Sequence, residues 1–179
     1  MKKTHILTAA LTLAMAACGS DSTDERDMQK PVISSEGIVA NPINCQVYHP
    51  GDTIYLEYMM EDNQELGNYH VEVHSDFDHH SHSTESDDDG DECPGSEPER
   101  VLPDTAWVFS QSYTIPAGQR RWHASQRIAI PQQIRLADRQ HPGDSLTLNT
   151  RPGDYHFMIR LTDRAGWQQL RAIAIKIAP

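Results

Sequence analysis

One short stretch of the sequence has residue types and spacing that suit metal binding. His70, Glu72 and His74 alternate with two valines. Successive side chains of a β-strand point to opposite faces, so the three polar side chains share one face, which is predicted to be exposed if the valines point inward. They would follow one another at roughly 7 Å. Two imidazoles and a carboxylate can then converge on one cation if a neighbouring strand supplies a further ligand, for which His156 is the candidate.

The residues directly after this stretch are rich in the same ligand types. Two aspartates (Asp76 and Asp78) and three histidines come first, and an acidic run follows over 85–92. No Lys or Arg occurs between Glu65 and Glu99. Imidazole nitrogen together with carboxylate oxygen suits zinc, and also Cu(II) or Ni(II). Binding should weaken as pH falls through about 6.5, because protonated imidazole cannot ligate. The predicted metal ligands are His70, Glu72, His74, Asp78, His79, His80, His82 and His156.

Three other uses of the acidic segment stay open. It can be a solvated loop that is incidentally rich in histidine. It can dock on a basic partner or on the arginines of this chain at positions 120, 121, 127 and 135. It can also bind calcium through Asp87, Asp89 and Asp91, because the stretch from Glu85 to Gly90 resembles the short acidic loops of extracellular calcium-binding repeats, although it departs from the EF-hand pattern.

The first 17 residues have the pattern of an export signal. Lys2 and Lys3 precede an apolar run over 6–17, which is too short to span a bilayer. The stretch from Met15 to Cys18 resembles a bacterial lipobox, which implies cleavage before Cys18 and acylation of that residue. The alternative is an ordinary secretion signal. Residues 18–30 are then a flexible tether. Gly19 and Ser20 place no acidic retention residue directly after Cys18, which suggests lipid anchoring to the outer membrane by resemblance to lipoprotein sorting rules.

Two further cysteines, Cys45 and Cys93, remain in the exported chain. An even pair in an oxidising compartment is most simply a disulfide. The alternative is a pair of thiols that serve as metal ligands or redox groups.

Short alternating segments indicate an all-β fold. Segments rich in β-branched and aromatic residues are bounded by Pro, Gly or Asp, and none has a helical period over three turns. About seven short strands suggest an immunoglobulin-like β-sandwich over 31–179, with a long His- and Asp-rich insert (75–105) after the third strand. In such a fold the third strand lies beside the strand that contains His156, and Tyr155 is like the corner tyrosine. The expected strands are 31–39, 53–59, 68–74, 107–115, 126–130, 154–162 and 169–177.

Several short motifs together resemble a known family. They are Asn44-Cys45, Gly51-Asp52-Thr53-Ile54, Leu66-Gly67, Phe77-Asp78-His79-His80-Ser81-His82 and Gly153-Asp154-Tyr155-His156. The chain is in these respects similar to small Gram-negative envelope lipoproteins of the domain of unknown function 4625 type. The resemblance implies an envelope lipoprotein with an immunoglobulin-like domain, and it carries no established activity or residue roles.

Composition excludes some functions. The chain has 179 residues, of which 37% are apolar, enough for one packed domain, and 26 acidic residues against 15 Lys and Arg. It has no basic block that could bind nucleic acid. Neither a nucleophile elbow nor a phosphate-binding glycine loop occurs, so we do not expect an enzyme. Two functions remain: metal buffering, delivery or sensing, with a metal transporter or another envelope protein as partner, or adhesion to a protein or glycan.

Overall fold

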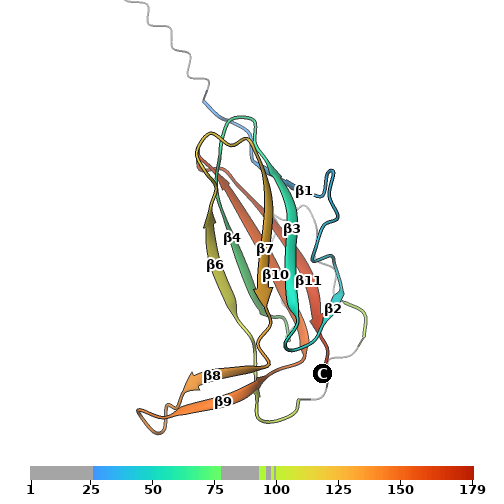
Figure 1. Ribbon diagram of the computed structural model, residues 1–179, viewed down its shortest axis with the longest axis vertical. Coiled ribbons are helices and arrows are strands. Elements are labelled where there is room, and N and C mark those ends of the chain that lie inside the picture. The colour runs from blue at the N-terminus through green and yellow to red at the C-terminus, as the bar shows by residue number, and fades with distance from the viewer. Residues whose placement is uncertain (1–25, 78–92, 96–97, 99) are drawn as a thin grey trace, which may run out of the picture.

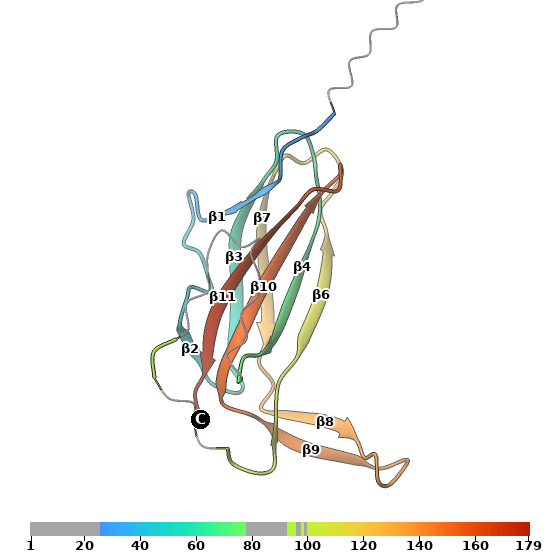
Figure 2. The same ribbon diagram turned by 180° about the vertical axis from the view of Figure 1, so that it is seen from behind.

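Alternating apolar residues build two sheets that pack face to face (Figures 1 and 2). The computed structural model describes residues 26–77, 93–95, 98 and 100–179. In these ranges the regular secondary structure consists of strands, which turns and loops connect. Within these ranges no helix is long and apolar enough to cross a membrane. The strands are β1 (Val32–Ser34), β2 (Gln46–Tyr48), β3 (Thr53–Glu61), β4 (Leu66–Ser75), β5 (Asp104–Thr105), β6 (Phe109–Thr114), β7 (Arg121–Ala129), β8 (Gln133–Ala137), β9 (Ser145–Thr150), β10 (Gly153–Asp163) and β11 (Gln168–Ile177).

The strand order is that of an immunoglobulin-like sandwich. One sheet has the order β1-β3-β7 and the other β2-β11-β10-β4-β6. Neighbouring strands are antiparallel except β2, which runs parallel to β11. The inner faces meet in a core in which Leu56 and Tyr58 of β3 lie in one cluster with Val71 of β4 and with Phe157 and Ile159 of β10. The all-β sandwich predicted from the sequence is therefore confirmed, including the pairing of the histidine-bearing strand β4 with β10.

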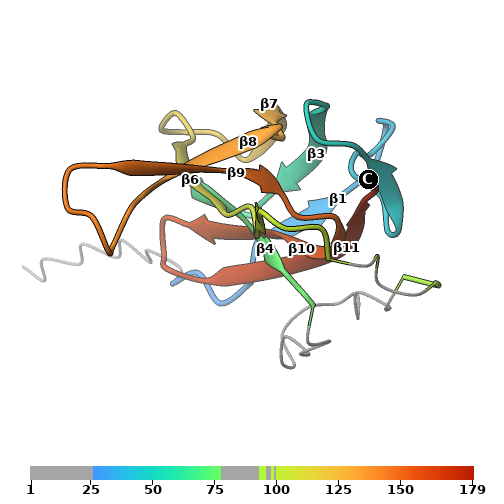
Figure 3. The ribbon, with the colours of Figure 1, turned by 90° about the horizontal axis from the view of Figure 1, so that it is seen from below.

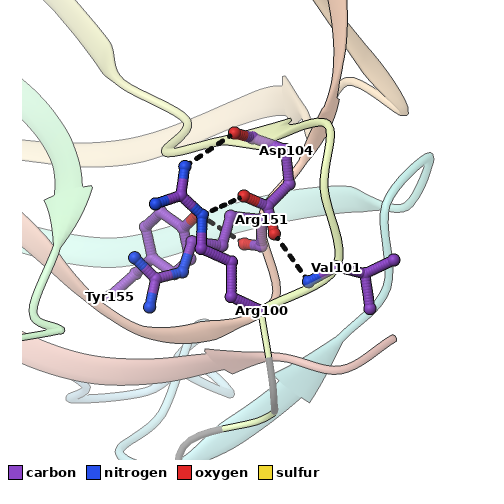
Figure 4. Close-up of polar contacts among 5 residues, drawn as sticks. All are labelled: Arg100, Val101, Asp104, Arg151 and Tyr155. Atoms are coloured by element: carbon purple, nitrogen blue, oxygen red, sulfur yellow. Dashed lines mark hydrogen bonds and ion pairs between the residues drawn. The ribbon is translucent and has the colours of Figure 1, made fainter.

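The predicted corner tyrosine opens β10. Tyr155 is fully buried, and its hydroxyl donates a hydrogen bond of 2.6 Å to the carbonyl oxygen of Arg151, four residues upstream (Figure 4). The same hydroxyl accepts a hydrogen bond of 3.3 Å from the backbone N–H of Trp107. Near it, the buried carboxylate of Asp104 accepts from the Arg100 Nε at 2.8 Å and from the Val101 N–H at 3.2 Å (Figure 4). These bonds fix the chain where it enters β10.

A third small sheet extends away from the sandwich. Its order is β5-β9-β8, and β8 and β9 form an arm at the end opposite the N-terminal segment (Figures 1 and 3). Leu136 of β8 and Leu146 of β9 lie directly opposite one another in register, 41% and 47% exposed. This arm was not predicted from the sequence.

Candidate metal centre

The two strands that carry the predicted ligands are direct neighbours. β4 and β10 pair antiparallel with His74 opposite His156 and Glu72 opposite Met158. The two imidazole rings meet edge to face, with centroids 5.6 Å apart and planes at 85°. The predicted convergence of His74 and His156 is therefore present in the fold.

Each of these imidazoles contacts a carboxylate. His156 Nε2 lies 3.1 Å from Asp76 Oδ2, and both side chains are less than 10% exposed. His74 Nδ1 lies 3.2 Å from Glu72 Oε1, with His74 20% and Glu72 44% exposed. Asp76 follows β4 directly, and its backbone N–H donates to the Asp154 carbonyl at 2.8 Å, so ladder pairing positions its side chain. We call His74, His156, Glu72 and Asp76 the His–carboxylate cluster.

The face that holds this cluster is less open than the sequence predicted. His156 and Met158 are only 6% and 7% exposed, and Ala172 and Ala174 of β11 are covered to the same degree. One reason is that β10 is a central strand between β4 and β11. Alternation in one strand gives the side on which a residue lies, and not what covers that side. The prediction of an exposed face is therefore wrong for β10 and only partly right for β4.

His70 lies apart from the cluster. It is opposite Arg160 on β10 and Ser112 on β6. Its Nδ1 is 2.9 Å from the Ser112 Oγ and its Nε2 is 3.2 Å from the Ser110 Oγ. Both ring nitrogens are thus engaged by serine hydroxyls, and the structure does not bring His70 to the pair of His74 and His156.

The two cysteines are neighbours beside the same face. Both are thiols in the structure, and the Cys45 side chain is a hydrogen-bonding neighbour of Cys93. Burial raises the pKa of Cys93 to about 12, and Cys45 and Asp154 add to the shift while Lys176 opposes it. Lys176 Nζ and Asp154 Oδ1 form an ion pair of 2.8 Å. This proximity supports the disulfide, which stays a prediction.

The remaining predicted residues lie outside the described part of the chain. These are the acylation site Cys18, the metal candidates Asp78, His79, His80 and His82, and the calcium candidates Asp87, Asp89 and Asp91. Phe77, which directly precedes this segment, belongs to the described residues. Its ring meets Tyr155 edge to face at 5.3 Å, and the Arg151 guanidinium carbon lies 3.9 Å from its centroid.

Sequence reasoning missed another group of candidate ligands. Among the described residues, the one set of three whose ligand atoms all lie within 4.8 Å of one another is Asp27, Asp62 and Asp163. The His–carboxylate cluster does not reach that mutual distance and would have to close around an ion. Asp62 and Asp163 each begin the turn that follows a strand, β3 and β10 respectively, which is a signal that the sequence offered. Asp27 lies in the N-terminal segment, where no local pattern marks it.

Fold and cluster together define an immunoglobulin-like β-sandwich protein with histidines and carboxylates on one outer face. The family described as Domain of unknown function (DUF4625) matches residues 16–178, and the chain belongs to that family. No curated protein matches the chain.

Proposed function

We propose that this protein is an acylated envelope lipoprotein that binds a divalent transition metal, with zinc as the first candidate. The observation that carries the proposal is the His–carboxylate cluster, in which His74 and His156 stand side by side and each contacts one carboxylate. Imidazole and carboxylate are the donors that zinc, Cu(II) and Ni(II) accept. A carboxylate bonded to an imidazole also holds the ring in the orientation that ligation needs.

The position of the cluster supports a contribution from the neighbouring histidines. Phe77 is packed on Tyr155 only three residues after His74, so the chain leaves β4 from a fixed point beside the cluster. His79, His80 and His82 follow within five residues of Phe77. We propose that they complete the coordination shell, and that part of the binding free energy is spent on ordering them.

The proposed role is buffering, delivery or sensing, and it involves no catalysis. A lipid on Cys18 would hold the domain at the outer membrane, where a metal transporter or another envelope protein would be the partner. The cluster lies on a strand face, near the start of β10, which is away from the N-terminal end of the domain.

Zinc titration of the full purified chain by calorimetry at about pH 7.5 tests this proposal. We expect His74→Gln to weaken zinc binding by about 10- to 100-fold, because one ligand is lost and Glu72 loses its imidazole partner. His70→Gln is the matched control, since His70 lies on the same face of the same strand but is engaged by Ser110 and Ser112. Zinc affinity that is unchanged in His74→Gln would overturn the proposed centre.

A second candidate function is adhesion through the β8–β9 arm. Leu136 and Leu146 form an exposed apolar pair there, beside a surface pocket of about 590 Å³ that Asp138 and Arg139 also line. Exposed leucines on a projecting hairpin are typical of a contact surface. Replacing both leucines with serine should abolish capture of an envelope partner in cross-linking on intact cells and leave zinc binding intact. Unchanged capture would argue against this candidate.

A further inference from the structure

Three aspartates meet at the end of the sandwich where the N-terminal segment enters. Asp27 belongs to that segment, Asp62 follows β3, and Asp163 is the last residue of β10 (Figure 1). One ligand oxygen of each lies within 4.8 Å of the others. Asp27 and Asp163 are only 6% and 4% exposed, and Asp62 is half-buried. We call these residues the aspartate cluster.

Each carboxylate uses one oxygen to accept backbone N–H groups. Asp163 Oδ1 accepts from Gly166 and Trp167 at 2.6 and 2.8 Å. Asp62 Oδ2 accepts from Gln64 and Glu65, both at 2.7 Å, and Asp27 Oδ1 accepts from Gln29 at 3.0 Å.

The other oxygens of two of these carboxylates are buried without a partner. Asp163 Oδ2 and Asp62 Oδ1 are shielded from solvent and accept no hydrogen bond within the described part of the chain. With Oδ1 of Asp163 committed to its own turn, Oδ2 is the oxygen that remains for the cluster. A buried carboxylate oxygen without a donor costs free energy unless a cation compensates it.

No side chain of the described residues supplies that cation. The Arg164 Nε pairs with Glu65 Oε1 at 3.2 Å, and the Arg120 Nε donates to the Gln64 carbonyl at 2.9 Å. Neither arginine forms an ion pair with the three aspartates. Burial raises the pKa of Asp163, and the charges of Asp62 and Asp27 raise it further, as expected for carboxylates that face one another.

We propose that Asp27, Asp62 and Asp163 bind a calcium ion. The three carboxylates offer only oxygen donors, whereas zinc prefers nitrogen and sulfur ligands, so this site does not suit zinc. Calcium accepts irregular sets of six to eight oxygens, whereas magnesium demands a near-ideal octahedron. The three carboxylates come from three different segments and do not offer that regular geometry; backbone carbonyls and water would complete the calcium shell. The site is separate from the calcium candidates Asp87, Asp89 and Asp91.

Calcium at this position would fasten the N-terminal segment to the domain. The carbonyl of Asp27 already accepts a hydrogen bond of 3.0 Å from Trp167 Nε1, in the turn after Asp163. A calcium ion held by all three carboxylates would also link Asp27 to the turns that begin at Asp62 and Asp163. If Cys18 is acylated, as the proposed function holds, only eight residues lie between that lipid-bearing residue and Asp27, so calcium would set how the domain sits above the membrane.

The test is calcium titration of the full chain after chelation, with magnesium in parallel, by calorimetry and thermal unfolding. We expect calcium in hundredfold excess over its Kd to raise Tm by on the order of 5–10 °C. Asp163→Asn and Asp62→Asn should each weaken calcium binding about tenfold or more, because the charge of the ligand set falls. Their amide oxygens can still accept the backbone N–H groups, so the turns persist.

Metal-free stability gives an independent readout. Asp163→Asn should melt higher than the unchanged protein without calcium, because one of three facing charges is gone, and should gain little when calcium is added. The matched control is Asp138→Asn, since Asp138 Oδ1 also accepts a backbone N–H two residues on, at 2.8 Å, but lies outside the cluster. No calcium binding, binding unaffected by both Asp62→Asn and Asp163→Asn, or equal affinity for magnesium would each overturn the proposal.

Discussion

At the scale of single residues, Tyr155 connects the chain entering β10 to the segment before β6. Its hydroxyl donates to the Arg151 carbonyl and accepts from the Trp107 N–H, and no part of the residue is exposed. Tyr155→Phe should therefore lower the free energy of unfolding by about 1–2 kcal/mol, because the Trp107 N–H and the Arg151 carbonyl both lose this partner. Urea unfolding measures the change. Tyr55→Phe is the control, since Tyr55 is 51% exposed, and an equal loss in both variants would contradict this role for Tyr155.

Cys93 is a second residue whose environment predicts its chemistry. Its pKa is raised to about 12, first by burial, so the neutral thiol dominates well above the ordinary thiol range. In a Cys18→Ser, Cys45→Ser variant, which leaves Cys93 as the one thiol, iodoacetamide should react slowly at about pH 9, where roughly one thiol in a thousand is ionised. Burial persists in this variant, although the smaller contribution of Cys45 is removed. The same protein in concentrated urea should react at the ordinary rate; fast alkylation of the folded protein would contradict the shift.

At the scale of elements, Gly67 controls how closely β4 approaches β10. A Cβ at this position would lie 2.8 Å from the Thr162 carbonyl oxygen and 2.9 Å from that of Asp163, and both atoms belong to the backbone. The β4–β10 register shifts between the same two residues, which marks a bulge. Gly67→Ala should cost about 1–3 kcal/mol of stability, because the strands must separate there.

The same substitution should also disturb the aspartate cluster, since Asp163 closes the bulge. We expect Gly67→Ala to weaken calcium binding as well as to lower the urea midpoint. Asn68→Ala, one exposed position further along β4, should change neither quantity. A Gly67→Ala protein with unchanged stability would show that the bulge accommodates a methyl group.

The elements that the sequence predicted are those with one apolar face against the core. β3, β4, β10 and β11 fall where alternation places them, to within a few residues. β7 begins at Arg121, five residues earlier than expected, because its first five residues offer only Trp122 and the small Ala124 as an apolar alternation. The arm of β8 and β9 was missed although Ile134 and Leu136 alternate with polar residues in β8, as do Leu146 and Leu148 in β9. Each alternation covers only two apolar residues, because the arm buries little against the core.

The candidate site was likewise predictable only in part. Alternation and strand order were enough to bring His74 next to His156. They could not assign Asp76 to His156, because that contact depends on one ladder bond beyond the end of β4. They could not show that His70 lies apart from these two histidines, because its partners, Ser110 and Ser112, lie on β6. The aspartate cluster depends on the path of the N-terminal segment, which no periodicity encodes.

At the scale of the whole molecule, most acidic residues lie in the first half of the chain and most basic residues in the second. Some of them become neighbours when the strands pair. Arg121 of β7 pairs with Glu61 of β3 at 3.1 Å, and the Arg127 guanidinium lies over Tyr55 at 5.4 Å from the ring centroid. These arginines, which the sequence offered as a docking surface for the acidic insert, lie in the sheet opposite β4 and have local partners.

The two proposed ion sites lie at different ends of β10, which predicts that they act independently. His156 and Asp163 are seven residues apart, roughly 23 Å along the strand. Sites at this distance without shared partners are expected to be additive. Zinc affinity should therefore be equal with and without calcium to within about twofold, His74→Gln should leave calcium binding unchanged, and Asp163→Asn should leave zinc binding unchanged. Calorimetric titration of each ion in the presence of the other measures this, with each variant serving as the control for the other. A change in zinc affinity of about tenfold on adding calcium would mean that β10 couples the two ends, because a rigid sandwich with separate ligand sets offers no other path between them.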